Sequence, residues 1–536
     1  MWRRRVRIMA DKIWKLRDLL SAAGLPVEIS VPDLPVTQVT DDSRAVRKGS
    51  LFVAVPGSAS DGHAFVGRAV EQGASAVLVQ KEIEIPAPAV KIRLSSTRAA
   101  LGPLAHAFWG SCSERLKVIG ITGTKGKTTV AWLTQHLLGF SGVPCGLIGT
   151  VCHDFGEGPS PSGNTTPGAI FLQKSLGRML EKGLKACAME VSSHALDQQR
   201  TDGIRWACGV FTNLAPEHLD YHATMEEYLR AKLRLFQALP EEACAVVHRD
   251  DPAWESVRRA TRARVLSYGL KEGADLTARK IRASLEGTEA ELCTPEGIIP
   301  VKSRLIGLHN MENLLAAVGA ALAAGVPAER AAQGAAAFAG VPGRLERIEC
   351  GQPFPLFVDY AHTDGALRRV LEQLRDLSNR KILTVFGCGG DRDRAKRPRM
   401  GRAAAELSDR VIVTSDNPRS EDPGAIAREI LAGAQGAGAP VQVILDRREA
   451  IRAALESADE KWLVLIAGKG HEEVQIFADR AIPFSDRAVA RELLKAPVTL
   501  SLPAACLPPA CRTGRDRQGQ AGLSKGDSGH GSTGSP

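Results

Sequence analysis

The sequence predicts an α/β protein of three domains followed by a tail. Its 536 residues exceed what one compact domain usually holds, since domains run to about 100–200 residues each. Hydrophobic residues make up 44% and charged residues 24%, which is typical of chains that bury their own cores. Short apolar runs alternate with helical stretches, the pattern of parallel sheets covered by helices.

The first domain is expected over residues 10–96 as a small α/β unit. It has strand-like runs at 51–55 and 76–79 and one helical stretch. A helix entry is expected at Met9, with residues 1–8 as an extension before it. The second domain, residues 97–340, is expected to be a parallel sheet of the P-loop type. Its strand candidates lie at 118–122, 186–191, 210–212 and 245–247.

The third domain is expected over residues 341–495 as a Rossmann-like α/β unit. Its strand candidates lie at 356–358, 382–386, 411–414, 441–445 and 463–467. Each is followed by a polar or glycine-bearing turn, which is where open α/β sheets bind their ligands. Residues 496–536 are rich in Pro, Gly, Ser and Arg without apolar periodicity, so a disordered tail without a catalytic role is expected.

Composition narrows the class of partner. The net charge of +9 comes from 69 basic and 60 acidic residues, and no basic run with interleaved aromatics appears, so nucleic acid is not the favoured partner. The excess of positive charge suits anionic small ligands. A slightly basic globular protein explains the charge equally well. The eleven cysteines lack metal-site spacing and indicate reduced thiols. No apolar run approaches 18 residues, so neither a membrane span nor a signal peptide is predicted, and we expect a cytoplasmic protein.

A glycine loop opens the second domain. The strand 118–122 runs into Gly123-Thr-Lys-Gly-Lys-Thr-Thr129 and then into a helical stretch at 130–138. Such a loop lets backbone N–H groups wrap a phosphate at the positive end of the helix dipole. Lys127 would reach the terminal phosphates and Thr128 would hold Mg²⁺. Ile121 stands where the strict GxxxxGK[ST] pattern has its first glycine. The loop predicts a nucleotide site but leaves open whether a carboxylate or water receives the phosphoryl group.

Four further segments follow in order: 164–167 (NTTP), 189–194 (MEVSSH), 213–222 (NLAPEHLDYH) and 231–236 (AKLRLF). Together with the loop at 120–129, they resemble the central domain of the Mur ligase family. The loop alone is also similar to that of folylpolyglutamate synthases. The resemblance covers about residues 10–495 and rests on the order and spacing of these segments.

The resemblance implies an enzyme that uses ATP and Mg²⁺ to form an amide through an acyl phosphate. It implies Lys127, Lys232 and His218 as catalytic residues. The implied metal ligands are Thr128, Glu190, His218 and Lys232, the last as a carbamate. The implied ATP contacts are Gly123, Thr124, Lys125, Gly126, Lys127, Thr128, Thr129, His309 and Asn310, with Tyr360 and His362 as further candidates. From the residues alone, Glu190 at the end of a strand is a hard oxygen ligand, whereas Lys232 would be a solvated surface lysine.

The resemblance also implies two substrate sites. Contacts to UDP-N-acetylmuramoyl-L-alanyl-D-glutamate are implied for Ser43, Ser58, Ala59, Ser60, Asn164, Thr165, Thr166, Ser192, Gln198 and Arg200. Contacts to meso-diaminopimelate are implied for Arg392, Asp416, Asn417, Pro418, Arg419, Gly468 and Glu472. Arg200 can clamp a carboxylate with two parallel hydrogen bonds, and Arg419 could meet the second carboxylate that distinguishes diaminopimelate from lysine. For the Ser and Thr residues taken singly, helix capping is the commoner role.

The implied reaction joins the D-glutamate carboxylate to meso-diaminopimelate in peptidoglycan precursor synthesis, catalysed by a monomer. Three alternatives stay open: an L-lysine-adding ligase, a ligase like folylpolyglutamate synthase, and a nucleotide-binding protein without ligase activity. The sequence departs from the common family pattern at three positions. His248 stands where Asn is common, Glu217 where Asp is frequent, and Asp364 where Pro commonly follows Thr. None of these changes removes an implied ligand.

Overall fold

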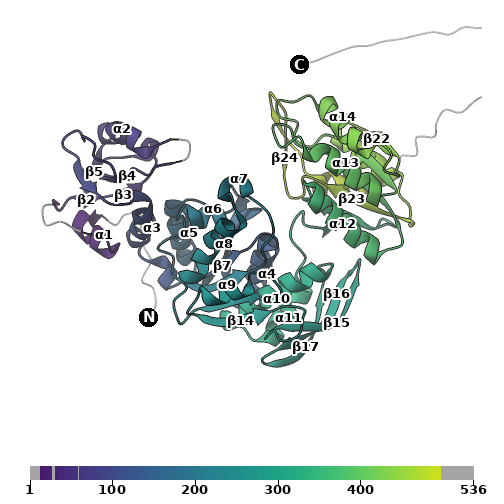
Figure 1. Cartoon of the computed structure of the whole chain (residues 1–536), viewed down its shortest axis with the longest axis horizontal. Coiled ribbons are helices and arrows are strands. Elements are labelled where there is room, and N and C mark those ends of the chain that lie inside the picture. The colour runs from purple at the N-terminus through teal and green to yellow at the C-terminus, as the bar shows by residue number, and fades with distance from the viewer. Residues whose placement is uncertain (1–12, 27–30, 58–59, 496–536) are drawn as a thin grey trace, which may run out of the picture. The chain divides into compact units, whose positions relative to one another are not determined.

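The computed structural model describes residues 13–26, 31–57 and 60–495, which form α/β regions along the chain (Figure 1). The helix entry expected at Met9, the contacts Ser58 and Ala59, and the tail at 496–536 lie outside the described residues. Among the described helices, none is long and apolar enough to cross a membrane. The cysteines in these ranges are free thiols, as their spacing predicted.

The first region contains a four-stranded parallel sheet in the order β3-β4-β5-β6. The predicted strands at 51–55 and 76–79 are confirmed as β4 and β5. Leu51 and Val53 pack with α1 and α3, while Phe52 packs with α2, because side chains alternate between the faces of a sheet. The elements are β1 (Trp14–Lys15), α1 (Leu16–Ala22), β2 (Pro35–Val36), β3 (Gln38–Thr40), β4 (Ser50–Val53), α2 (Val66–Glu71), β5 (Ala74–Val79), β6 (Val90–Arg93) and α3 (Thr97–Phe108).

The second region is built on an eight-stranded sheet in the order β10-β9-β8-β11-β7-β12-β13-β14. Six neighbouring strands are parallel, as predicted, and only β9 and β10 at one edge pair antiparallel. The strands are β7 (Lys117–Thr122), β8 (Cys145–Ile148), β9 (Cys152–Asp154), β10 (Pro159–Pro161), β11 (Ala186–Glu190), β12 (Trp206–Phe211), β13 (Cys244–His248) and β14 (Arg264–Tyr268).

Helices cover both faces of this sheet, which explains why its central strands are largely apolar. Ile119 and Ile121 of β7 pack with one set of helices, and Val118 packs with the other. The first set is α4 (Lys127–Phe140), α10 (Leu308–Ala323) and α11 (Ala328–Ala337). The second set includes α5 (Ala169–Glu181), α8 (Met225–Gln237) and α9 (Trp254–Arg259). Two short helices, α6 (Ser193–Asp197) and α7 (Leu219–His222), follow strands β11 and β12.

A three-stranded antiparallel sheet at 277–303 was missed by the sequence reading, which expected the βαβ rhythm up to about residue 339. It is formed by β15 (Thr277–Ser284), β16 (Gly287–Thr294) and β17 (Gly297–Ser303). Ala278, Leu292 and Val301 pack into the core shared with α10 and α11. Most residues of β15 are exposed, so its apolar signal is weak.

The third region contains a six-stranded sheet in the order β18-β19-β23-β20-β21-β22, parallel except for β18. All five predicted strands are confirmed, and β22 ends two residues before the predicted limit. The strands are β18 (Glu346–Arg347), β19 (Leu356–Asp359), β20 (Lys381–Phe386), β21 (Arg410–Val413), β22 (Val441–Val443) and β23 (Trp462–Ala467), with a hairpin of β24 (Val474–Ile476) and β25 (Ala481–Pro483). The helices are α12 (Asp364–Leu377), α13 (Lys396–Leu407), α14 (Pro423–Ala434), α15 (Arg447–Glu456) and α16 (Asp486–Lys495).

Parallel pairing aligns the carboxyl ends of neighbouring strands. In the central sheet, Glu190 at the end of β11 pairs with Ile121 of β7, and Phe211 of β12 pairs with Thr122. The segments that leave these strands therefore gather at one edge of the sheet, where open α/β sheets bind ligands. The domain limits predicted above stay predictions.

Candidate active site

The glycine loop lies between β7 and α4, as the sequence predicted. Gly123 and Gly126 have φ values of +143° and +86°, which side chains rarely adopt. A Cβ atom at Gly126 would lie 2.3 Å from Asn313 Oδ1 of α10, so space also requires glycine there. Thr212 Oγ1 donates to the carbonyl of Lys125 at 2.6 Å, and the backbone N–H of Lys125 donates to Asn213 Oδ1 at 2.8 Å. The loop is thus held by β12 and α10.

Two lysines converge on one carbonyl of this loop. Lys127 Nζ donates to the Gly123 and Thr124 carbonyls at 2.9 and 2.8 Å, and Lys232 Nζ donates to the Gly123 carbonyl at 2.8 Å. Burial lowers the pKa of both amines, and that of Lys232 falls well below its usual value. Lys232 is only 1% exposed and its amine lies 4.2 Å from the centroid of the Tyr228 ring. The interpretation of Lys232 as a solvated surface residue, taken from spacing alone, is wrong.

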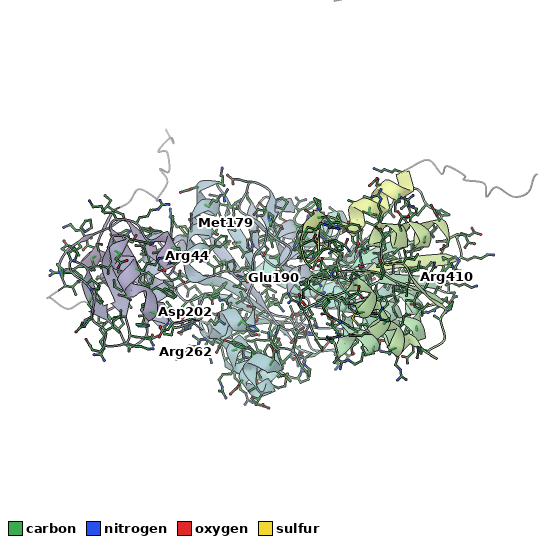
Figure 2. All side chains as sticks on the ribbon, turned by 90° about the horizontal axis from the view of Figure 1, so that it is seen from above. Arg44, Met179, Glu190, Asp202, Arg262 and Arg410 are labelled. Carbon is green, nitrogen blue, oxygen red and sulfur yellow. The ribbon has the colours of Figure 1, made fainter. Side chains whose placement is uncertain are left out.

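Oxygen atoms gather beside the loop. Thr128 Oγ1 donates to Glu190 Oε2 at 2.9 Å, and both residues are buried. Thr150 donates to the same carboxylate from its backbone N–H at 2.7 Å and from its hydroxyl at 3.1 Å. Glu190 is labelled in Figure 2, within the central region. A hydroxyl and a carboxylate that already meet are the donor set that Mg²⁺ takes in proteins. Sequence reasoning missed Thr150, because no motif marks it.

His218 begins α7 with a left-handed φ of 59°. It is exposed, and its ring lies 4.9 Å from that of His194 and 6.2 Å from that of Tyr228, measured between centroids. Partial burial lowers the pKa of His218, which favours the neutral ring that binds metals. His194 and His222, which had no predicted role, lie 5.5 Å apart in the same ring cluster. His218 therefore lies near Lys232, since the Tyr228 ring is close to both residues.

Five residues predicted to hold the muramoyl dipeptide lie together beside Glu190. Thr166 Oγ1 donates to the Glu190 carbonyl at 2.8 Å and accepts from the Ser192 backbone N–H at 3.0 Å. Arg200 donates to the Thr166 carbonyl at 2.9 Å and to Gln198 Oε1 at 2.6 Å. Thr165 shares a hydrogen bond with Thr150 at 3.0 Å.

Other predicted contacts are more dispersed. Asn164 and Ser60 are exposed, and Ser43 is buried in a 3₁₀ turn that Asp42 caps.

On the nucleotide side, Thr124 is buried, Thr129 lies in the first turn of α4, and Lys125 pairs with Glu217 at 2.5 Å. His309 is exposed on α10, whereas Asn310 is buried and accepts from Asn313 at 3.0 Å. In the third region, the Tyr360 and His362 rings lie 4.6 Å apart. Arg344, which sequence reasoning missed, lies 4.8 Å over Tyr360.

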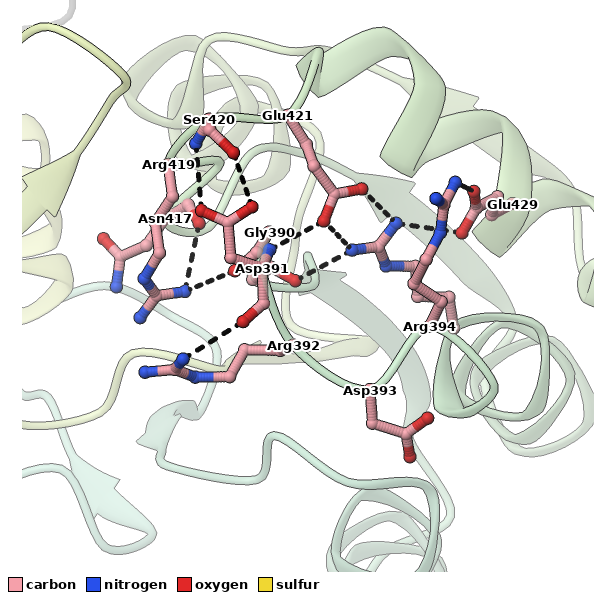
Figure 3. A network of polar contacts seen from close by, with 12 residues as sticks. Gly390, Asp391, Arg392, Asp393, Arg394, Asn417, Arg419, Ser420, Glu421 and Glu429 are labelled. Carbon is pink, nitrogen blue, oxygen red and sulfur yellow. Dashed lines mark hydrogen bonds and ion pairs between the residues drawn. The ribbon is translucent and has the colours of Figure 1, made fainter. Parts of the chain in front are cut away.

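The residues predicted to bind diaminopimelate meet at the carboxyl edge of the third sheet. Asn417 donates to Glu472 Oε2 at 2.8 Å, and Arg419 Nη1 donates to the Gly390 carbonyl at 2.8 Å. Figure 3 shows Arg419 and Arg392 beside the loop of Gly390 and Asp391. Arg392 is exposed and donates to the Asp391 carbonyl at 3.1 Å. A Cβ at Gly468 would lie 2.8 Å from Asp416 Oδ2, so only glycine lets the backbone come this close to the Asp416 carboxylate.

Two ionic groups support this site. Buried Arg397 pairs with Glu421 and Glu429, and Glu421 accepts from the Asp391 backbone N–H at 2.6 Å (Figure 3). Lys469 is fully buried and donates to Asn417 Oδ1, Glu472 Oε2 and the Val474 carbonyl at 3.0, 2.9 and 2.7 Å. Burial alone would raise the pKa of Glu472. The Lys469 charge outweighs this and holds the pKa of Glu472 below its ordinary value. Sequence reasoning quoted the segment of Lys469 but assigned this lysine no role. Its place beside Gly468 was the available signal.

Comparisons with known proteins show the family of this chain. Residues 35–109 match the model of the Mur ligase family, catalytic domain, residues 121–321 match the Mur ligase middle domain, and residues 343–470 match the Mur ligase, glutamate ligase domain. The chain belongs to the Mur ligase family. In this Mur ligase, the middle-domain match includes Glu190, His218 and Lys232.

Several relatives of this Mur ligase have curated names. It is 43% identical over 470 residues to the UDP-N-acetylmuramoyl-L-alanyl-D-glutamate--2,6-diaminopimelate ligase of Geobacillus thermodenitrificans, covering 87% of this chain and 95% of the relative. It is 40% identical over 483 residues to the enzyme of the same name from Listeria monocytogenes, covering 89% and 98%. A solved structure of an enzyme with this name aligns with a TM-score of 0.70 at 33% identity, covering 90% and 99%. The folylpolyglutamate synthase of Mycobacterium tuberculosis, at 19% identity and a TM-score of 0.57, shares the fold.

Proposed function

We propose that this Mur ligase joins the D-glutamate carboxylate of UDP-N-acetylmuramoyl-L-alanyl-D-glutamate to meso-diaminopimelate, with conversion of ATP to ADP and phosphate. The observation that carries the proposal is Asn417, which lies between the Arg419 guanidinium and the Glu472 carboxylate, in a chain whose relatives at 40–43% identity are named diaminopimelate ligases. A cation and a carboxylate that both contact one asparagine suit the carboxylate and ammonium at the far end of diaminopimelate. We expect the enzyme to work as a cytoplasmic monomer.

The first chemical step transfers the γ-phosphoryl group. A carboxylate oxygen of the D-glutamyl residue attacks the γ-phosphorus, the bond to the β,γ-bridging oxygen breaks, and ADP leaves. Two anions must approach each other, so the site has to supply positive charge. Lys127 and the N-terminus of α4 supply it at the terminal phosphates. Thr128 and Glu190 would hold Mg²⁺, which neutralises phosphate charge, and His218 would contribute to a second metal position.

The second step forms the amide bond. The amine of diaminopimelate attacks the carbonyl carbon of the acyl phosphate, the amine loses a proton, and inorganic phosphate leaves. Arg200, held by Gln198 and the Thr166 carbonyl, would orient the dipeptide, because a fixed guanidinium binds a carboxylate in one plane. Correct placement of the two reactants supplies most of the rate enhancement in such transfers.

We further propose that Lys232 reacts with carbon dioxide to form a carbamate. Its amine attacks the carbon of CO₂, a C–N bond forms and a proton is released. Only a neutral amine can do this, and burial lowers the pKa of Lys232 well below its usual value. We expect Lys232→Ala to be nearly inactive and to recover part of its activity with added acetate or formate. A fully active variant, or one that these anions do not rescue, would contradict the carbamate.

The function is tested by measuring ADP release with purified substrates. We expect ADP release to require both UDP-N-acetylmuramoyl-L-alanyl-D-glutamate and an amino acid, with meso-diaminopimelate preferred over L-lysine in a panel. Equal use of L-lysine would favour the lysine-adding alternative. ADP release without the muramoyl dipeptide would favour an NTPase, and use of a folate acceptor would favour the folylpolyglutamate alternative. Omitting Mg²⁺ should stop ADP release with every combination of substrates.

A further inference from the structure

A buried histidine at the end of β13 has one ring nitrogen without a partner. His248 Nδ1 lies 2.9 Å from the Thr212 carbonyl. A carbonyl can only accept, so Nδ1 carries the hydrogen, and Nε2 of the neutral ring presents a lone pair. His248 is 7% exposed, and Nε2 has no hydrogen-bond partner among the described residues. The ring is stacked on Tyr268 at 4.9 Å between centroids and 6° between planes, which fixes its direction.

This nitrogen points toward two carboxylates. Nε2 lies 3.7 Å from Glu312 Oε1 of α10 and 4.0 Å from Asp250 Oδ2 in the loop after β13. Both distances are too long for hydrogen bonds. The ligand atoms of the three residues lie within 4.8 Å of one another, and within the described ranges no other group of His, Cys, Asp and Glu meets this condition. Two carboxylates and a lone pair that face each other in a mostly buried site repel unless a cation lies between them.

The surroundings hold Asp250 and His248 in place. Asp250 Oδ2 accepts from the backbone N–H groups of Leu270 and Lys271 at 2.7 and 3.1 Å. Histidines that bind metals usually donate their other ring N–H to a carbonyl or carboxylate, as Nδ1 of His248 does to Thr212. The site therefore has the outer hydrogen bonds that orient metal ligands.

We propose that His248, Asp250 and Glu312 bind a first-row transition-metal dication of the Zn²⁺ type, at a site separate from the magnesium site of the glycine loop. One imidazole and two carboxylates favour such ions over Mg²⁺. Ligands of a tetrahedral Zn²⁺, each about 2.0–2.1 Å from the metal, lie about 3.4 Å apart. The observed separations of 3.7 and 4.0 Å are close to this value, so small side-chain movements close the site. Glu312 is 32% exposed, which gives the ion a path from solvent.

The position of this site indicates a structural role. The ion would join β13 to α10, and His248 is bonded to Thr212, whose hydroxyl donates to the Lys125 carbonyl of the glycine loop. Bound metal would therefore stiffen the support of that loop without contacting the phosphates. The family commonly has Asn at position 248, and an amide offers no imidazole nitrogen. The site is thus a feature of this chain and is independent of the proposed function.

The test uses the full-length protein, stripped with a chelator and then exposed to Zn²⁺ in excess Mg²⁺, so that the glycine-loop site is filled. Zinc retained after gel filtration is compared for the wild type, His248→Asn, Glu312→Gln and the matched control His136→Asn. His136 is a partly buried histidine of α4 outside the cluster. We expect the wild type and His136→Asn to retain one more equivalent of zinc than the other two variants, and only these two proteins to show a zinc-dependent rise in Tm. His248→Asn should fold, because it carries the residue common in the family.

A second measurement uses the wild type alone and does not depend on the folding of variants. X-ray absorption of the zinc-loaded wild type should show nitrogen and oxygen ligands at about 2.0–2.1 Å and no sulfur. Sulfur ligands, or equal zinc retention by the wild type and His248→Asn, would overturn the proposal. A wild type that retains no zinc would also overturn it. Wild-type affinity in Glu312→Gln would refute the three-ligand site.

Discussion

Replacing Arg419 by alanine tests how the enzyme selects its amino acid. Only Nη1 of Arg419 is engaged, by the Gly390 carbonyl at 2.8 Å and the Asn417 carbonyl at 3.5 Å. Its Nε and Nη2 have no hydrogen-bond partner among the described residues, so these two donors form a free fork for a carboxylate. Arg419 has a left-handed φ of 52°. Alanine keeps the Cβ and the same backbone preference, so the substitution removes the guanidinium and little else.

The size of the effect follows from these contacts. Hydrogen bonds to charged groups contribute about 1.5–3 kcal/mol each, and the fork offers two of them. Because the side chain is half-buried, solvent screening reduces the sum, and we expect a loss of about 3 kcal/mol, on the order of a hundredfold in kcat/KM for diaminopimelate. Arg419→Lys keeps the charge but loses the planar fork, so about a tenfold loss is expected.

The assay is steady-state ADP release with meso-diaminopimelate and with L-lysine, each at saturating ATP and muramoyl dipeptide. Arg419→Ala should lower kcat/KM for diaminopimelate and leave that for L-lysine nearly unchanged, because lysine lacks the second carboxylate. Arg428→Ala, an exposed arginine of α14 paired with Asp422, serves as the control and should match the wild type. An equal loss with both amino acids would mean that Arg419 only supports the loop of Gly390, and the specificity argument would fail.

Three further outcomes are expected. Lys127→Met should lower kcat by about 10²–10³-fold, because a charge at the transferring phosphoryl group is lost, and near-normal ADP release would contradict the loop assignment. Lys469→Met should lower the free energy of unfolding by about 1–3 kcal/mol and weaken use of diaminopimelate, since three hydrogen bonds of a buried ammonium disappear; unchanged urea unfolding would contradict this. Burial lowers the pKa of Lys232 in the folded protein. Between the folded and unfolded pKa values, the unfolded chain binds a proton at Lys232 that the folded chain does not. The free energy of unfolding therefore rises with pH in that range. In CO₂-free buffer, the free energy of unfolding should therefore rise between about pH 7 and 9 more steeply in the wild type than in Lys232→Met, by up to about 1.4 kcal/mol per pH unit; parallel curves would contradict a neutral Lys232.

The central strands of each sheet could be predicted because burial on both faces makes them largely apolar. β7, β11 and β23 have no exposed residue in their last five positions, and each was predicted to within one residue at its ends. The sheet at 277–303 could not be predicted in the same way. It buries one face only and carries charged residues such as Arg279 and Arg282 on the other. Its pairing also depends on the core formed with α10, which follows it in the chain.

The residues of the candidate site also differ in whether local sequence predicts their positions. Gly126, Thr128 and Glu190 could be predicted because strand, loop and helix follow one another directly, so local sequence fixes their positions. Thr150 could not, because its role arises from a long-range contact with Glu190, and the contacts of Lys469 with Asn417 are equally long-range although its place beside Gly468 was a signal. Lys232 is the clearest case. Its sequence neighbourhood is that of an amphipathic helix, and only the packing of α8 against the glycine loop shows that its amine is buried.

Buried lysines are costly, and their placement here indicates what the site is prepared to bind. Lys127 and Lys232 meet at the Gly123 carbonyl, so the site keeps two amines within one loop before any phosphate is present. Lys127 donates hydrogen bonds to two carbonyls. When a nucleotide binds, hydrogen bonds to phosphate oxygens must replace them. Because a charged acceptor binds an ammonium more strongly than a carbonyl does, the exchange favours binding. Lys232 has one carbonyl partner and an aromatic face, so its proton is held weakly. Burial lowers the pKa of both amines, and lowers that of Lys232 further, so Lys232 is the one whose neutral, reactive form is favoured.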